Sequence, residues 1–408
     1  MGYLQLLREN ANFRNLYISR LISLFGDWVN LIAIFTLIRE ILGPSPIASS
    51  IVLVLKFLPN TLVSPIAGIF ADRYDRKTIL IWSDISRFLV VACFWLVPLF
   101  PNIWFIYTLI FLQTALGTFF EPARTAMMPD IVPGKALITA NALGGIAWAL
   151  MLTFGSAAGG ILTELFGWRV NITIDALSYL ISAIFILRIK YTPTYKPVES
   201  EKRSGWNENK ELYTRLYKDP RLFHLSILKG TYSIGGAASL MLTMYGQEIF
   251  PSGATGAMSL SALLVARGLG ATFGPVIGRW YAESDTTKLQ RVVLFSLIIF
   301  GFFYTVLSVT NNLWLACLMV FFAHMGGSSL WAFSTVLLQI EAAPDIRGRV
   351  FGFEFGLATL SSSIATLLFG YLIDIDVLSI REASAAMGVS LALPVCLWLY
   401  ALQRYFKK

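Results

Sequence analysis

The sequence predicts an all-α integral membrane protein with twelve transmembrane helices, arranged as two halves of six. Hydrophobic residues make up 56% of the chain and charged residues only 14%, whereas a soluble domain carries about 25% charged residues. The apolar runs are continuous rather than alternating, which indicates helices and excludes a membrane β-barrel. A length of 408 residues accommodates about twelve spans of roughly 20 residues each, with short connections.

An internal repeat supports the division into two halves. Residues of the same type coincide when the chain is shifted by 210 or 211 positions: Gly68 with Gly278, Asp75 with Asp285, Pro133 with Pro344, Gly145 with Gly356 and Gly159 with Gly370. Parallel repeats of this kind are typical of secondary transporters. We therefore predict a first half at residues 1–189, a cytoplasmic linker at 190–220 and a second half at 221–408.

The spans follow from the apolar runs and their breaks. In the first half they are predicted at about residues 16–38, 47–70, 79–99, 104–127, 137–165 and 170–187. In the second half they are predicted at about 222–245, 257–281, 292–309, 313–339, 350–373 and 383–405. The polar linker is expected to contain a short interfacial helix, because Leu212, Leu216, Tyr213 and Tyr217 fit one helical face.

The distribution of positive charge predicts the orientation. Most of the 32 Lys and Arg residues lie at the two termini and in the even-to-odd loops, while Arg39, Arg169 and Arg381 lie in the odd-to-even loops. The positive-inside rule then places both termini in the cytoplasm of a multi-pass protein of the inner (plasma) membrane. The net charge of +8 is therefore a topology signal and not a sign of nucleic-acid binding. The first span is expected to be an uncleaved insertion signal.

Cofactor and metal chemistry find no support in the sequence. Cys93, Cys317 and Cys396 lie in apolar segments at unrelated spacings, and His224 and His324 cannot form a zinc site alone. The chain has no Gly-x-x-x-x-Gly-Lys-Ser/Thr run, so ATP does not drive it directly. We predict no cofactor, no metal and no enzymatic activity, and energy supplied by an ion or substrate gradient.

A dense charged loop separates the second and third spans. It reads Gly68-Ile-Phe-Ala-Asp72-Arg73-Tyr-Asp75-Arg76-Lys77. Gly68 is predicted to end an apolar helix and to let another backbone approach, and Asp72 is followed by three cations within five residues. The alternative is an ordinary basic loop that obeys the positive-inside rule.

This loop resembles the cytoplasmic loop between helices 2 and 3 of major facilitator superfamily transporters. The family pattern is Gly-x-Leu-Ala-Asp-Arg-x-Gly-Arg-Lys, in which Phe70 stands for the Leu and Asp75 for the second Gly. The Asp resembles a variant of the drug:proton antiporter-3 group, which includes macrolide, siderophore and lysophospholipid exporters. Three further segments are similar to that group: Phe25-Gly26-Asp27, Ile174-Asp175-Ala176-Leu177 and Pro344-Asp-Ile-Arg347-Gly348-Arg349-Val350. Two departures are Ser156 at an expected Pro, and a degenerate second loop at residues 278–285.

The resemblance implies the major facilitator fold, a monomer and a gating role for the loop. Asp72 would sit near the N-terminus of span 11, where Gly348 opens a helix whose positive dipole end attracts an acid. The cations of the loop would meet acids such as Glu121 and Asp130 at the base of span 4. These contacts would hold the cytoplasmic side closed until alternating access opens it. The implied gating residues are Gly68, Asp72, Arg73, Asp75, Arg76, Lys77, Glu121, Arg124, Arg347, Gly348 and Arg349.

Ionisable side chains at membrane depth cost about 2.5–3.5 kcal/mol each on insertion, so each is a candidate functional residue. The candidates are Arg20, Asp27, Lys56, Arg87, Asp175, Lys229, Arg267, His324 and Glu354. Asp27 lies near the middle of span 1, with Arg20 two turns earlier on one face. Burial favours a protonated acid and a nearby cation an ionised one, so Asp27 is a candidate for proton coupling. The alternative is a structural bond from Asp27 to a neighbouring helix.

Three further residues of this set carry open alternatives. Asp175 is either a second coupling group or an acid stabilised by the helix dipole near the start of span 6, and the second reading is favoured. Lys56 and Lys229 are candidates to face a central cavity and to meet an anionic substrate. Snorkelling, or pairing with Asp27, is the alternative for both lysines.

These observations favour an exporter of an amphipathic small molecule, such as a drug, macrolide or siderophore, that works by proton antiport. Its expected partners are the substrate, protons and the lipid bilayer, with no nucleic acid. A second hypothesis is a lysophospholipid flippase with an apolar lateral opening and no obligatory proton coupling. A third is a receptor or scaffold that keeps the fold without transport, although it would not need the charged loop or the intramembrane acids.

Overall fold

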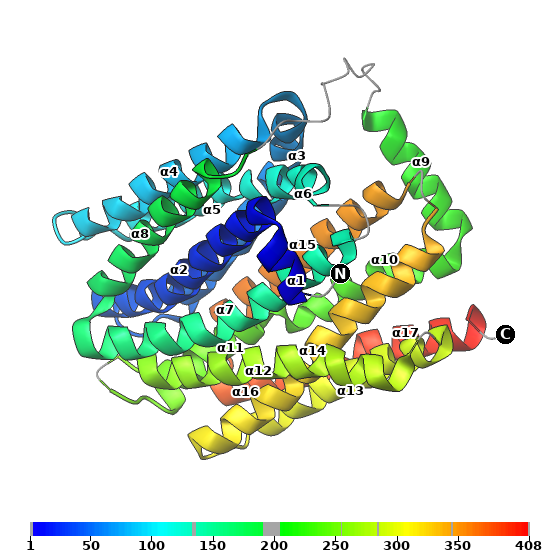
Figure 1. Ribbon diagram of the computed structural model, residues 1–408. Helices are drawn as coiled ribbons and strands as arrows, with labels where there is room; N and C mark the ends of the chain where they lie inside the picture. The colour runs from blue at the N-terminus through cyan, green and yellow to red at the C-terminus, as the bar shows by residue number, and fades with distance from the viewer. Residues whose placement is uncertain are drawn as a thin grey trace. The chain divides into compact units, whose positions relative to one another are not determined.

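The computed structural model describes residues 3–132, 136–190, 205–253, 255–283, 285–343 and 346–406. Every regular element within these ranges is a helix, and eleven helical segments are long and apolar enough to cross a membrane (Figure 1). Three of these segments, Arg76–Leu96, Ile103–Ile131 and Ile380–Arg404, each join two consecutive helices. The predicted fold class is therefore confirmed. The chain divides into two compact units, one of Met1–Val198 with Gly246–Val265, the other of Glu199–Tyr245 with Ala266–Lys408.

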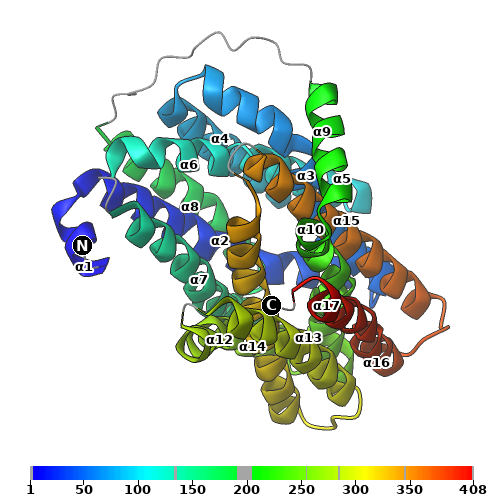
Figure 2. The same ribbon diagram turned by 90° about the vertical axis from the view of Figure 1, so that its right-hand side faces the viewer.

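The first unit is built around a long central helix. Its helices are α1 (Tyr3–Glu9), α2 (Ala11–Leu42), α3 (Pro46–Arg73), α4 (Arg76–Ala92), α5 (Ile103–Gly117), α6 (Phe120–Ile131), α7 (Leu137–Phe166) and α8 (Trp168–Leu187). Helix α2 packs along both α7 and α8, and α4 packs on α8, as Figures 1 and 2 both show. This arrangement brings residues from the first and sixth predicted spans into contact.

Side chains with short polar groups fix where the helices begin. Asn10, Ser45, Asp75 and Asn102 each precede a helix and accept a hydrogen bond from a backbone N–H of its first turn. Such N-caps satisfy donors that the helix itself leaves unpaired. Helix α2 begins five residues before the predicted span because Asn10 caps it there.

The second unit contains the remaining spans. Its helices are α9 (Gly205–Lys218), α10 (Pro220–Tyr232), α11 (Ala238–Met244), most of α12 (Ala257–Ala282), α13 (Thr286–Leu307), α14 (Leu313–Glu341), α15 (Arg347–Asp374), α16 (Ile380–Ser390) and α17 (Ala392–Arg404). Asp285 caps α13 just as Asp75, its counterpart in the repeat, caps α4. Backbone N–H bonds from Thr287 and Lys288 hold the pKa of Asp285 below its usual value.

The span predicted at residues 222–245 is not one continuous α-helix. It consists of α10, a 3₁₀ helix at Ser233–Ala237, α11 and a π-helical turn at Tyr245–Ile249. Gly235 and Gly236 lie in the 3₁₀ segment, and a Cβ at Gly236 would meet Ser362 of α15. Close approach of α15 therefore requires glycine here, and the sequence pattern did not reveal the resulting break.

Two predictions about the linker and the charged loop need correction. Leu212 and Leu216 of α9 are buried, whereas Tyr213 and Tyr217 are exposed, so they do not share one face. The linker residues 191–204 lie outside the described part of the chain. Gly68 does not end a helix, because α3 continues to Arg73. Within the first unit, no described atom lies within 4 Å of where a Cβ of Gly68 would be, so close approach of another backbone of this unit does not explain the glycine.

Candidate functional site

A network of polar side chains lies inside the first unit, at the depth of its membrane-spanning helices. Asp27 and Asn30 come from α2, Lys56 from α3, Gln113 from α5 and Asp175 from α8. Asn30, Gln113 and Asp175 are buried, while Asp27 and Lys56 are half-buried. Buried polar groups of this kind are costly unless they are paired, so their contacts decide what the network can do.

Asp27 is held by a tyrosine of another helix. The hydroxyl of Tyr179, which is fully buried on α8, donates to Asp27 Oδ1 at 2.6 Å. A hydrogen bond from a neutral donor to a carboxylate is stronger than one between neutral groups. Asp27 therefore does form a hydrogen bond to a neighbouring helix, which was the alternative to a role in proton coupling. It does not exclude a proton-coupling role, because Asp27 remains half-buried.

Asp175 lies fully buried against α2. Its Oδ2 atom accepts hydrogen bonds from Asn30 Nδ2 at 2.5 Å and from Gln113 Nε2 at 3.0 Å. Its Oδ1 atom has no hydrogen-bond partner among the described residues. A Cβ at Gly26 would lie 2.6 Å from that oxygen, so glycine lets α8 bring the carboxylate close to α2. The segments Phe25-Gly26-Asp27 and Ile174-Asp175 thus pack against each other.

Gln113 links the two acids. Its Nε2 group lies 2.9 Å from the Tyr179 hydroxyl as well as 3.0 Å from Asp175, and its Oε1 atom accepts from Lys56 Nζ at 3.3 Å. The network therefore runs from Lys56 through Gln113 to Asp175, and through Tyr179 to Asp27. Lys56 also interacts electrostatically with both carboxylates. Neither snorkelling nor a direct pair with Asp27 describes Lys56, because its ammonium group donates its hydrogen bond to Gln113.

An ion pair on α4 borders this network. Arg87 pairs with Asp84, and Ser182 Oγ donates to the other oxygen of Asp84 at 2.6 Å. The guanidinium group lies 4.2 Å from the centre of the Tyr179 ring, which is a cation–π contact. Arg87 therefore holds the ring whose hydroxyl binds Asp27. The sequence analysis did not identify four members of this network: Asp84, Asn30, Gln113 and Tyr179. Only Asp84 has a charged side chain, which is the feature that marked the other candidates.

Arg20 has a different partner from the one expected. It pairs with Glu121 on α6, which also pairs with Arg124 at 2.9 Å. The side chains of Arg20 and Glu121 are 21% and 43% exposed, so this cluster is more exposed than the network around Asp175, whose side chain is fully buried. Glu121 was predicted to meet the cations of the charged loop, but its partners lie on α2 and on its own helix.

The charged loop is tied to neighbouring helices of the same unit. Arg76 pairs with Asp130 at 2.9 Å and donates to Ala126 O at 3.0 Å, in line with the predicted contact to the base of span 4. Lys77 Nζ donates to the carbonyls of Leu187 and Ile189, at and just beyond the end of α8, at 2.9 Å each. These bonds satisfy carbonyls that the helix end leaves free.

The other predicted gating residues are less informative. Arg73 is exposed, and Asp75 is the N-cap of α4, with Thr78 N at 2.8 Å from Oδ2. Arg347, Gly348 and Arg349 form the first turn of α15, where Arg347 donates to Ala342 O at 3.1 Å. The side chain of Asp72 and the residues Pro344 and Asp345 lie outside the described part of the chain.

Lys229 finds its partner inside the second unit. Its Nζ atom lies 3.1 Å from Glu354 on α15 and donates to Thr335 Oγ1 on α14 at 2.6 Å. Both charged side chains are almost fully buried, and the ammonium lies 4.6 Å from the centre of the Trp331 ring. Lys229 is therefore paired by a buried acid of its own unit, so neither a free cation nor a snorkelling side chain describes it.

Two further candidate residues of the second unit have uncharged partners. Arg267 on α12 donates to Ser239 Oγ at 2.8 Å, and His324 lies 3.0 Å from the Tyr304 hydroxyl. Among the described residues, no group of three His, Cys, Asp or Glu side chains is placed to hold a metal ion.

The chain belongs to the Major Facilitator Superfamily, whose family model matches residues 16–366. It is accordingly a multi-pass membrane transporter of small molecules and not an enzyme. It is 26% identical over 408 residues to a putative bacilysin exporter of Bacillus subtilis (strain 168), a match that covers 97% of this chain and 94% of the relative. It is 22% identical to macrolide efflux protein A of Streptococcus pyogenes, over 89% of each chain.

Another relative matches a shorter stretch. An uncharacterized MFS-type transporter of Bacillus subtilis (strain 168), YfiS, is 31% identical over 182 residues, which is 44% of this chain and 43% of the relative. The solved structure of a POT family transporter in complex with 5-aminolevulinic acid aligns with a TM-score of 0.79 at 10% identity. That alignment covers 98% of this chain and 97% of the other. At this identity the likeness concerns the fold alone.

Proposed function

We propose that this protein exports an amphipathic small molecule, such as a drug, macrolide or siderophore, in exchange for protons by alternating access. The observation that carries the proposal is the network that joins Asp27, Tyr179, Gln113 and Asp175 inside the first unit. The names of the two full-length relatives, a bacilysin exporter and a macrolide efflux protein, favour efflux over uptake.

The charge balance of the network explains how it would take up a proton. Asp27, Asp84 and Asp175 interact with Arg87, and Lys56 interacts with two of them, so we treat these five residues as one charged group. Glu121 also interacts with Arg87, but it is paired by Arg20 and Arg124. If all are ionised the group carries a net charge of −1, and one bound proton neutralises it. Because an unbalanced charge at membrane depth is costly, one bound proton would offset the excess negative charge, and a substrate or a helix movement that changes the balance would release it.

Asp27 is the acid that we assign to proton exchange. Asp175, Asp84 and Arg87 are buried, whereas Asp27 is half-buried and can meet water. The Arg20–Glu121–Arg124 cluster is partly exposed, so water screens its influence on this balance. One proton that crosses the membrane down a potential of 100 mV supplies about 2.3 kcal/mol, which is the free energy available for expelling the substrate.

The test is efflux of a fluorescent cationic dye and of a macrolide antibiotic from cells, with and without a proton uncoupler. We expect the parent protein to export the compounds and the uncoupler to abolish this efflux. The Asp27→Asn variant should show no efflux even without the uncoupler. The matched control is Asp285→Asn, because asparagine caps a helix as well as aspartate does. The proposal would be contradicted if neither the uncoupler nor the Asp27→Asn substitution changed the efflux rate of either compound.

A lysophospholipid flippase remains the second candidate, and one observation favours it. An apolar cavity of about 450 Å³ lies among α2, α7 and α8, lined by residues that include Phe25, Met151, Leu177 and Ile181. Leu177 and Ile181 are 48% and 43% exposed, so the cavity opens on the side of the helices that faces away from the core. Such a cavity suits an acyl chain. Transfer of lysophospholipid that is indifferent to the uncoupler would favour this candidate over proton antiport.

We further infer the setting in which the protein works. The distribution of Lys and Arg supports cytoplasmic termini in the plasma membrane. We infer a monomer of two six-span halves, at residues 1–189 and 221–408, joined by the linker at 190–220. The gating role of Asp72, Arg73, Arg347, Gly348 and Arg349 stays a proposal that rests on the resemblance of their motifs.

A further inference from the structure

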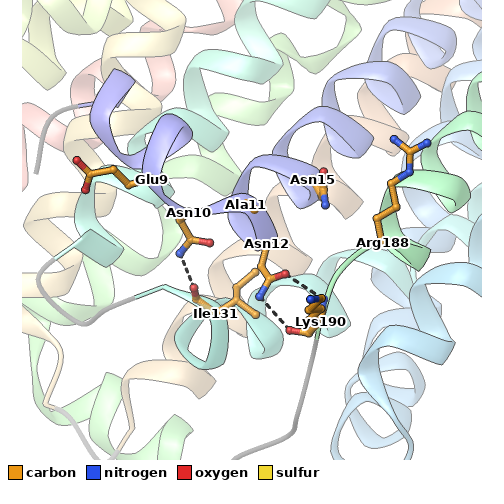
Figure 3. Close-up of a pocket in the computed structure, with 8 residues that line it drawn as sticks. All are labelled: Glu9, Asn10, Ala11, Asn12, Asn15, Ile131, Arg188 and Lys190. Carbon is orange, nitrogen blue, oxygen red and sulfur yellow. Dashed lines mark hydrogen bonds between the residues drawn. The ribbon is translucent and has the colours of Figure 1, made fainter.

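A second cavity of the first unit lies apart from the acidic network and is polar. It has a volume of about 530 Å³ and is lined by the side chains of Asn10, Asn12 and Asn15, the cations Arg188 and Lys190, and Glu9 (Figure 3). The residues come from the end of α1, the start of α2 and the segment that follows α8. None of them is used in the proposed transport chemistry.

Backbone contacts fix the shape of this cavity. Asn12 Nδ2 donates to Lys190 O at 2.9 Å, and the Lys190 backbone N–H donates to Asn12 Oδ1 at the same distance. Asn10 Nδ2 donates to Ile131 O at 2.6 Å at the end of α6. Both pairs appear as dashed lines in Figure 3. The start of α2 is therefore anchored to the ends of α6 and α8, and the cavity is part of the folded unit.

The charge of the cavity favours an anion. Arg188 and Lys190 are exposed, and neither forms an ion pair with any acid in the described part of the chain. The single acid of the lining, Glu9, accepts from Gln5 Nε2 at 3.0 Å and extends away from Arg188 in Figure 3. Arg8 and Arg14 add positive charge within a turn or two of the lining. Asn15 supplies a further uncharged carboxamide beside these cations, while the Nδ2 atoms of Asn10 and Asn12 already donate to backbone carbonyls.

The position of the cavity favours a lipid over a soluble anion. Helix α2 begins at Ala11, α6 ends at Ile131 and α8 ends at Leu187, so three spanning segments end around it. The polar headgroups of the bilayer lie at the level where spans end. Basic pockets between spans on the cytoplasmic side are suited to anionic headgroups. In α1, Leu6 is buried and Leu4 is 69% exposed, which suits a short helix at the membrane surface.

We propose that this cavity binds the headgroup of an anionic phospholipid, with Arg188 and Lys190 at its phosphate. The bound lipid would hold the start of α2 and the ends of α6 and α8 at the membrane surface. This assignment does not depend on the exported substrate, because its residues are separate from Asp27 and Asp175. It holds whether or not transport is coupled to protons.

The test is a binding titration of the purified full-length protein with dioleoylphosphatidylglycerol and with dioleoylphosphatidylcholine, followed by native mass spectrometry. We expect tighter binding of the anionic lipid, and a loss of about tenfold or more in that binding for the double variant Arg188→Gln/Lys190→Gln. The matched control is Lys288→Gln/Arg291→Gln, which removes two cations from the start of α13.

Two outcomes would overturn the proposal. One is equal binding of the two lipids, or the same loss in the control as in the cavity variant. The other is full displacement of phosphatidylglycerol by millimolar inorganic phosphate, which would assign the cavity to a soluble anion. Gel filtration of each variant verifies its fold, and the single variant Lys190→Gln, whose backbone bonds to Asn12 remain, keeps the test valid if the double variant fails to fold.

Discussion

At the scale of single residues, the first unit concentrates its charge around one aromatic side chain. Tyr179 donates to Asp27, receives the guanidinium of Arg87 on its ring and lies within hydrogen-bond distance of Gln113. A change of position of this ring alters the surroundings of both acids at once. Tyr179 therefore links Asp27, the acid that we propose for proton exchange, to the Asp84–Arg87 pair on α4.

The Asp84–Arg87 pair gives a prediction about stability. Asp84→Ala leaves the buried Arg87 without its counter-charge, and breaking a buried pair in this way costs about 3–5 kcal/mol. We expect a large fall in the thermal unfolding midpoint of the purified protein. The double variant Asp84→Ala/Arg87→Met removes both charges and should recover most of that loss. A double variant as unstable as the single one would show that the unpaired charge is not the cause.

Residue type in the sequence identified some members of the site and missed others. Asp27, Lys56 and Asp175 were found because an ionisable group inside a span is costly wherever it points. Asn30, Gln113 and Tyr179 were missed because neutral polar residues occur in spans for many reasons. The predicted surroundings of Arg20 and Lys229 were wrong. Their partners lie on other helices, and the spacing of residues along one helix does not show which helices are neighbours.

At the scale of helices, caps and glycines decide where elements begin and how closely they pack. Asp75 and Asp285 lie 210 positions apart and each caps the third helix of its half. The departure of Asp75 from the family glycine thus has a structural reason. Gly26 has another, because it admits the Asp175 carboxylate next to α2.

The cap at Asp75 can be tested separately from transport. Asp75→Ala removes the side chain that accepts from Thr78 N, and we expect a loss of about 1 kcal/mol in stability. Asp75→Ser keeps a capping oxygen and should retain the stability of the parent. Thermal unfolding followed by tryptophan fluorescence measures both. Equal destabilisation by alanine and serine would mean that Asp75 acts through its charge in the loop.

Each of the eleven spanning segments of the structure corresponds to a span that the sequence predicted. The seventh predicted span, at residues 222–245, was wrong in being given as one helix. Apolar length alone locates a span, so the prediction succeeded wherever one helix crosses the membrane. The 3₁₀ segment at Ser233–Ala237 packs closely against α15, and the average hydropathy of the sequence does not report such a local change of helix type. The glycine pair Gly235-Gly236 was no usable signal, because Gly144-Gly145 and Gly159-Gly160 lie inside the unbroken helix α7.

At the scale of the whole molecule, the two halves of the repeat differ in their acids. A shift of 211 positions places Lys56 opposite Arg267 and Gln113 opposite His324, so both polar positions persist. The same shift places Asp27 opposite Ala238 and Asp175 opposite Ala386. The acids of the network therefore belong to the first half alone. We infer that the first half handles protons, because the buried acid of the second half, Glu354, is already paired with Lys229.

The measurement that tests this account most directly is proton movement in proteoliposomes that contain the purified protein and an internal pH-sensitive dye. Addition of a transported cationic dye or macrolide should drive proton movement in the parent protein and in Asp285→Asn. Asp27→Asn should bind the compound but show no coupled proton movement. Substrate transport by the parent without proton movement, or coupled movement that persists in Asp27→Asn, would contradict the assignment of this chain as a proton-coupled exporter.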